Sequence, residues 1–207
     1  MSDRAKLEGF WKKQYSQEDM PFDADEPDKW IQCLAENGQI RGRVLDSGCG
    51  PGRNALYLSG LGFAVLGADI SAAAIARAEE KARQKNLSVR FITADICSLY
   101  AVNNYFDTVI DIGCFHSLAP EHQDYYIEAL TRLCRPGATL YLRAFCDLNI
   151  SRKIYPDGCG WPAITESRIR TAFHAYRWEV KQIIPQKIDL LSFKGRVYAW
   201  LAEIQKE

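Results

Sequence analysis

The chain has no surplus of charge of either sign, because 26 lysines and arginines stand against 26 aspartates and glutamates. Proteins that bind nucleic acid or an anionic membrane surface usually carry a basic excess or patch. The sequence also has no apolar run of about 18 residues, the length that would span a bilayer, and no signal-peptide core after Met1. These absences predict a small-molecule partner, no nucleic acid, no membrane and a cytoplasmic location.

Metal-binding signatures are missing as well. The seven cysteines contain no C-x-x-C pair, and several lie inside apolar runs, where a thiol packs as a small hydrophobe. The three histidines have no thiol or carboxylate at ligand spacing outside the motifs described below. We therefore expect reduced cysteines and no metal.

The order of apolar patterns predicts one α/β domain over residues 1–207. Strand-like runs alternate with helical spacing from residue 43 to 145, which is typical of parallel strands joined by right-handed crossovers. The expected fold is a Rossmann-like, doubly wound, mostly parallel sheet of seven strands, with the last strand antiparallel. Its parts are an N-terminal helical lid (1–40), a cofactor-binding core (41–146), and a substrate-side insertion with a C-terminal hairpin (147–207). The expected strands are 43–47, 63–69, 89–93, 105–112, 138–145, 178–184 and 196–202; the expected helices are 3–15, 27–36, 54–60, 72–85, 123–133 and 165–176.

A glycine-rich turn follows the first expected strand. Gly48, Gly50 and Gly52 come directly after Asp46, and a second acid, Asp69, ends the next strand 17 residues after Gly52. Glycines allow a ligand to approach the backbone closely, and an acid at this place accepts hydrogen bonds from ribose hydroxyls. The pattern predicts a nucleoside-containing cofactor.

Five successive motifs resemble those of class I S-adenosylmethionine-dependent methyltransferases. They span residues 44–54, 67–71, 94–96, 106–111 and 133–140. The resemblance implies S-adenosylmethionine as cofactor and S-adenosylhomocysteine as product. It implies a cofactor site made of Trp11, Phe22, Asp46, Gly48, Gly50, Gly52, Arg53, Asn54, Asp69, Ile70, Asp95, Ile96 and Asp111.

Within that set the resemblance also implies individual roles. Asp46 would bind the amino group of the cofactor, and Asp69 would take both ribose hydroxyls. Asp95 would hold the adenine amino group, with the Ile96 backbone at the ring edge and Ile70 packed on the ring. Each acid has an alternative interpretation as a helix cap or a solvated surface group.

The N-terminal half resembles the thiopurine methyltransferase-like branch, which includes thiol and tellurite (TehB-like) methyltransferases. Trp11 and Phe22 stand at the spacing of that branch's aromatic lid, and residues 53–63 match it as well. Ile112 departs from the arginine of thiopurine enzymes, whereas Gly113–Leu118 resembles small-thiol methyltransferases. The implied activity is in-line methyl transfer to a small thiol or other chalcogen acceptor.

The expected acceptor side follows the fourth strand. His116 is the candidate base or substrate-orienting group, and a cap or a bond to a backbone carbonyl is its alternative. Arg143 could hold an acidic substrate or neutralise a buried acid. The further substrate residues are Cys114, Phe115, Tyr155 and Trp161.

Other functions stay open from the sequence. One is an O- or N-methyltransferase of a small metabolite. A nicotinamide oxidoreductase would prefer G-x-G-x-x-G to the G-x-G-x-G found here, and a non-catalytic nucleoside-binding protein would keep the same motifs. The chain is expected to be a monomer or a homodimer.

Overall fold

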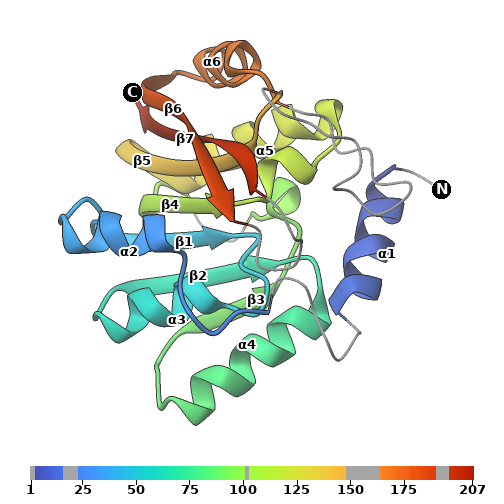
Figure 1. Ribbon diagram of the computed structural model, residues 1–207, viewed down its shortest axis with the longest axis vertical. Helices are drawn as coiled ribbons and strands as arrows, with labels where there is room; N and C mark the ends of the chain where they lie inside the picture. Colours follow the sequence, from blue (N-terminus) through green and yellow to red (C-terminus); the bar gives the residue numbers. More distant parts are fainter. Residues whose placement is uncertain (1–2, 16–22, 101–102, 148–163, 190–195) are drawn as a thin grey trace.

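A computed structural model describes residues 3–15, 23–100, 103–147, 164–189 and 196–207. Within these ranges the strands form one seven-stranded sheet in the order β3-β2-β1-β4-β5-β7-β6 (Figure 1). The strands are β1 (Arg43–Ser47), β2 (Ala64–Asp69), β3 (Arg90–Thr93), β4 (Phe106–Ile112), β5 (Cys134–Phe145), β6 (Trp178–Asp189) and β7 (Arg196–Lys206).

The sheet is parallel from β3 to β5. Only β7 runs against its neighbours: it pairs antiparallel with β5 and with β6, so that Ala202 lies between Leu142 and Ile183. The predicted fold, a doubly wound sheet whose last strand is antiparallel, is confirmed.

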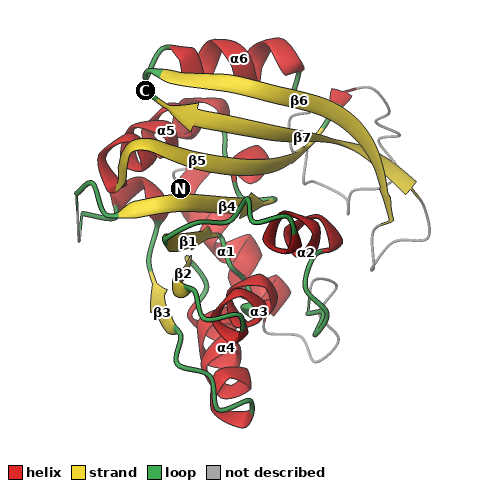
Figure 2. Cartoon of the chain, turned by 90° about the vertical axis from the view of Figure 1, so that its left-hand side faces the viewer, coloured by secondary structure: helices red, strands yellow, loops and turns green. Residues whose placement is uncertain are grey.

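Helices cover both faces of the sheet (Figure 2). One core cluster joins the sheet to α2 (Lys29–Glu36), α3 (Arg53–Gly60) and α4 (Ala72–Gln84). The other joins it to α5 (Pro120–Leu133) and α6 (Glu166–His174). Successive residues of the central strands point to opposite faces, which explains why their apolar runs are continuous.

Most helix ends have local causes. The Ser71 hydroxyl accepts a hydrogen bond from the Ala74 amide at the start of α4, and Thr165 does the same for Arg168 at the start of α6. The expected start of α5 at residue 123 is wrong, because Pro120 occupies the first helical position, where a missing N–H costs nothing. The final hairpin is also longer than expected, since β6 continues to Asp189.

Helix α1 (Asp3–Tyr15) lies apart from the two covering layers. It packs on α4 at the end of the sheet toward which β1 runs (Figure 1). Trp11 and Tyr15 form a small cluster there with Ala74. Two short 3-10 helices, η1 (Ile96–Ser98) and η2 (Phe115–Ser117), follow β3 and β4 at the same end. Among the described residues, no helix has both the length and the apolarity to cross a membrane.

Candidate functional site

The glycine turn leaves no room for side chains. Gly48 and Gly50 have φ angles of +68° and +53°, which only glycine adopts without strain. A Cβ on Gly48 would lie 2.7 Å from the Cys114 Cβ, and one on Gly50 would lie 2.8 Å from the Tyr15 hydroxyl. Gly52 has a φ angle of +81° as well, and its Cβ would lie 2.7 Å from the Phe91 ring.

A cavity of about 960 Å³ opens at this end of the sheet. It brings together most of the predicted site residues: Trp11, Asp46, Gly48, Gly50, Arg53, Asn54, Asp69, Ile70, Asp95, Ile96, Cys114, His116 and Arg143. Gly52, Asp111 and Phe115 do not line it. Phe22, Tyr155 and Trp161 lie outside the described residues.

Asp69 joins the end of β2 to the glycine turn. Its Oδ2 accepts a hydrogen bond from the Gly50 amide and its Oδ1 one from the Ser71 amide, both at 2.8 Å. Only 7% of the residue is exposed, and this burial raises the pKa of the carboxyl despite the two amides. The carboxylate is thus fixed in orientation at the cavity wall.

Asp46 and Asp95 line the cavity, and each also accepts a hydrogen bond from an amide of a helix. The Asp46 carboxylate accepts a hydrogen bond from the Ala55 amide at 3.0 Å, in the first turn of α3, and Asp95 caps η1 through the Cys97 amide. Burial raises the pKa of Asp46 to about 7, and Arg53 opposes that rise. Asp46 therefore changes its charge near neutral pH.

Asp111 holds the turn after β4 through hydrogen bonds to its side-chain oxygens. Its two oxygens accept hydrogen bonds from the amides of Gly113, Cys114 and Phe115 and from the Tyr126 hydroxyl at 2.6 Å. It is fully buried, which raises its pKa to about 6. Asp111 therefore fixes the conformation of the turn that carries Cys114. It does not form part of the cavity surface.

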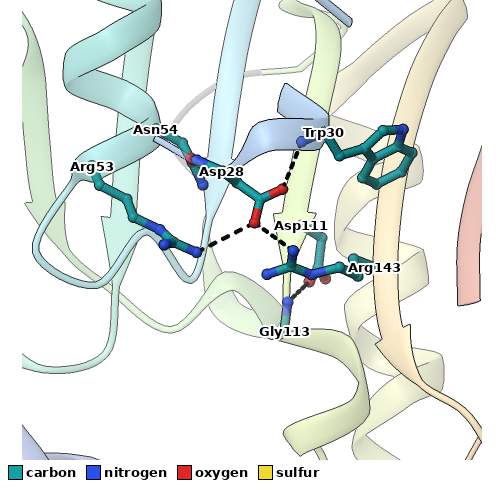
Figure 3. A network of polar contacts seen from close by, with 7 residues as sticks. All are labelled: Asp28, Trp30, Arg53, Asn54, Asp111, Gly113 and Arg143. Atoms are coloured by element: carbon teal, nitrogen blue, oxygen red, sulfur yellow. Dashed lines mark hydrogen bonds and ion pairs between the residues drawn. The ribbon is translucent and has the colours of Figure 1, made fainter. Parts of the chain in front are cut away.

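Asp28 connects three elements around the cavity (Figure 3). Its backbone amide donates to Asn54 Oδ1 at 2.8 Å, and its side chain caps α2 through the Trp30 amide. The same carboxylate pairs with Arg53 at 3.5 Å and, more closely, with Arg143 of β5. Arg143 does neutralise a buried acid, and it also lines the cavity.

His116 lies where the acceptor is expected. It is 3% exposed, and its ring packs against Phe145 with 4.4 Å between centroids. Burial, together with the positive charge of Arg143, lowers the pKa of this imidazole to about 3. The side chain is therefore neutral at physiological pH. Phe115, by contrast, points into the core against Tyr126 and Phe173.

Sequence reasoning missed three residues of the site. Tyr15 stacks on Trp11 at 5.6 Å, and its position four residues later on one helical face was a usable signal. Asp28 stands where an N-cap would, but the sequence alone placed it inside the helix. Nothing in the local sequence distinguishes Tyr126, which lies in the middle of α5, from other core aromatics.

These residues fit S-adenosylmethionine. Gly48 and Gly50 line the cavity, which is large enough for a nucleoside and a small acceptor together. The cofactor carries an ammonium group, which Asp46 complements, and ribose hydroxyls, which Asp69 complements. Apolar Ile70 and Ile96 border the same cavity beside Asp95, as an adenine ring requires.

Comparison with known proteins agrees with this geometry. Residues 44–137 match the family model described as a methyltransferase domain. An uncharacterized methyltransferase of Schizosaccharomyces pombe is 42% identical over 119 residues, which cover 58% of this chain and 82% of that one. The 2-heptyl-1-hydroxyquinolin-4(1H)-one methyltransferase of Mycobacteroides abscessus is 32% identical over 81% of this chain and 72% of its own.

Among solved structures, one concerns the conversion of a disulfide bond into a thioacetal group during echinomycin biosynthesis. Its sequence is 30% identical, the TM-score is 0.85, and the alignment covers 97% of this chain and 92% of that chain. With the fold, the cavity and these relatives in agreement, the chain belongs to the class I S-adenosylmethionine-dependent methyltransferases.

Proposed function

We propose that the enzyme methylates a small molecule at an acidic chalcogen, with a thiol as the first choice. S-Adenosylmethionine supplies an electrophilic methyl group on a sulfonium. The chain's part is to hold the acceptor in line with that methyl group in a pocket from which water is excluded. In this proposal Asp46, Asp69, Asp95 and the glycine turn bind the cofactor, and the ends of β4 and β5 bind the acceptor.

The proposal rests first on the burial of His116 near the positively charged Arg143, which together lower the pKa of its imidazole. An imidazole whose pKa is held to about 3 cannot remove a proton from an alcohol or phenol with useful efficiency. In this proposal Asp46, Asp69 and Asp95 serve the cofactor, Asp28 is paired with two arginines, and Asp111 does not line the cavity; His122 is a second imidazole on the cavity wall. An acceptor that ionises by itself near neutral pH suits such a site. Thiols, with an ordinary pKa of about 8.5, meet this requirement.

The similarity to a structure concerned with disulfide and thioacetal chemistry supports a sulfur acceptor. A second candidate follows from the relative in Mycobacteroides abscessus, whose name gives a hydroxylated quinolone as its acceptor. An acidic N-hydroxy heteroaromatic would also arrive as an anion. The aromatic side chains of Trp30, Tyr125 and Phe145 at the cavity wall suit a flat ring of this kind.

An acceptor screen separates the two candidates. We expect methylation of aliphatic or aromatic thiols, measured as S-adenosylhomocysteine formation and by mass of the product, at rates well above those for matched alcohols and phenols. Preferential methylation of an N-hydroxyquinolone would favour the second candidate. Turnover of amines but of neither acidic class would contradict the proposal.

Cofactor affinity should fall in acid. Asp46 has its pKa raised to about 7, so it loses its charge, and its attraction for the amino group, as the pH drops below that value. Linkage predicts a loss of about tenfold in affinity per pH unit below 7. Calorimetric titration with S-adenosylhomocysteine from pH 8 to 5 measures it. The Asp46→Asn variant keeps an acceptor oxygen for Ala55 and should show weaker, nearly pH-independent binding; an unchanged slope would exclude Asp46 as its source.

A further inference from the structure

One carboxylate is shared by two guanidinium groups beside the expected acceptor. Asp28 pairs with both Arg53 and Arg143, and the three side chains are 9%, 20% and 17% exposed. A buried cation is costly unless it is fully compensated. The single charge of Asp28 does not neutralise both guanidinium groups; the other carboxyls that interact with them are Asp46 for Arg53 and Asp111 for Arg143, and burial raises the pKa of both acids.

The guanidinium-bearing residue Arg143 lines the cavity beside the end of β4. Arg143 lies opposite Ile112 in the β4–β5 register, so it stands beside the turn that carries Cys114 and His116. Phe145, two residues further along β5 and hence on the same face, packs against His116. The charged groups that act on Arg143 are Asp28 from the start of α2, Arg53 from α3 and Asp111 from β4, and Arg143 in turn acts on His116 of η2.

The order of the strands separates this point from the cofactor's anchors. Asp95 and Asp69 follow β3 and β2, and the glycine turn follows β1, whereas Arg143 is on β5, beyond β4. A cofactor laid along the first three of these strand ends places its reactive sulfur toward β4. Arg143 then lies on the acceptor's side.

From this arrangement we propose that Arg143 is the residue that ionises the bound acceptor, and that Asp28 is a positioning residue that aims the guanidinium and limits its charge. The inference rests on the proposed transfer to an ionisable acceptor and names the group responsible for ionisation. His116 then orients the acceptor as a neutral hydrogen-bonding group and does not remove its proton.

The chemical balance is simple. As a thiol pairs with the guanidinium, its proton leaves to solvent and the thiolate stays. The thiolate sulfur forms a bond to the methyl carbon, while the bond from that carbon to the sulfonium sulfur breaks. The electron pair of the broken bond stays on the sulfur of S-adenosylhomocysteine, the leaving group. Arg143 keeps its own proton throughout, because a guanidinium does not deprotonate under these conditions.

The test measures the ionisation of the bound acceptor directly. Benzenethiols of graded acidity are titrated in the dead-end complex with S-adenosylhomocysteine, with thiolate formation followed by ultraviolet absorbance, and the acid limb of kcat/KM is recorded alongside. In the wild type the bound thiol should ionise about 1–3 pH units below the free thiol. In Arg143→Gln the ionisation pH of the bound thiol should return toward that of the free thiol. Arg143→Lys keeps the positive charge and should retain most of the lowering of the ionisation pH.

Asp28→Asn should shift the ionisation pH of the bound thiol in the opposite direction to Arg143→Gln. A merely structural role of Asp28 would not produce that shift. Asparagine keeps the α2 cap but removes the competing negative charge, so the bound thiol should ionise at still lower pH. His116→Asn should leave the ionisation pH in place, whatever its effect on rate. Arg170→Gln, at a half-exposed arginine of α6 paired only with Glu166 among the described residues, is the matched control.

The outcomes are distinguishable. An ionisation pH that stays in place in Arg143→Gln overturns the inference, and a shift in His116→Asn would then assign the ionisation to His116. So does an Arg143→Gln variant that loses affinity for S-adenosylhomocysteine about tenfold or more, since the guanidinium would then serve the cofactor. If no thiol binds or reacts but an N-hydroxyquinolone does, the sulfur proposal fails, and the same titration on the quinolone still tests Arg143.

Discussion

Replacing Asp69 by alanine is expected to weaken the binding of S-adenosylhomocysteine by about two to three orders of magnitude. The proposed bonds from the carboxylate to two ribose hydroxyls are charge-assisted, and each is worth about 1.5–3 kcal/mol. The substitution also removes the acceptor of the Gly50 and Ser71 amides, so the glycine turn keeps only the backbone hydrogen bonds from Gly48 and Cys49 to Ala68 of β2. Calorimetric titration of both proteins measures the change.

Asp69→Asn is the informative companion, because it keeps a hydrogen-bond acceptor and removes the charge. We expect it to fall between the wild type and alanine. Asp124→Ala, on the exposed side of α5, controls for the loss of a carboxylate as such. Micromolar binding retained in Asp69→Ala would remove the ribose role from this acid, and binding of a dinucleotide instead would reopen the oxidoreductase alternative.

Replacing Asp111 by alanine is expected to cost about 3–5 kcal/mol of folding free energy, because a buried network loses the acceptor common to all its members. Three backbone amides and the Tyr126 hydroxyl would be left without that acceptor. A domain of this size has a total stability of only about 5–15 kcal/mol. Urea unfolding should show a large drop in the midpoint.

Tyr126→Phe removes one donor from the same network and leaves the amides bonded. We expect a smaller loss of about 1–2 kcal/mol, with cofactor binding largely retained because Asp111 still holds the turn. Equal destabilisation by the two variants would mean that the hydroxyl, rather than the amide bonds, dominates the network.

The sequence predicted the part of the molecule that repeats a local pattern. Strand β1, the glycine turn and Asp69 could be read directly, because glycines without Cβ atoms and an acid after a strand have only a few physical uses. Asp46, Asp69 and Asp95 line one cavity with His116 and Arg143, whereas the fourth predicted acid, Asp111, does not. Their roles toward the cofactor remain predictions.

Contacts between side chains that lie far apart in the sequence could not be predicted from local patterns. Asp28 and Arg143 are 115 positions apart, and Tyr126 reaches Asp111 from a different element. Asp111 illustrates the difficulty. Its place near the end of β4 matches the family pattern, yet only the fold shows that its oxygens accept hydrogen bonds from the amides of the turn that follows. The exact length of β6 depended on pairing with β7, which no local periodicity contains.

The long edge strand β6 has a consequence for how copies of this protein meet. An unpaired strand edge is a template for adding a further strand, and natural proteins guard against it with short strands, charge or proline. Here β6 carries Pro185, which has no N–H to donate, between the exposed lysines Lys181 and Lys187. At the other margin β3 is only four residues long. Both margins of the sheet are therefore poor starting points for intermolecular β-pairing, although the hairpin exposes a long ribbon beside the cavity.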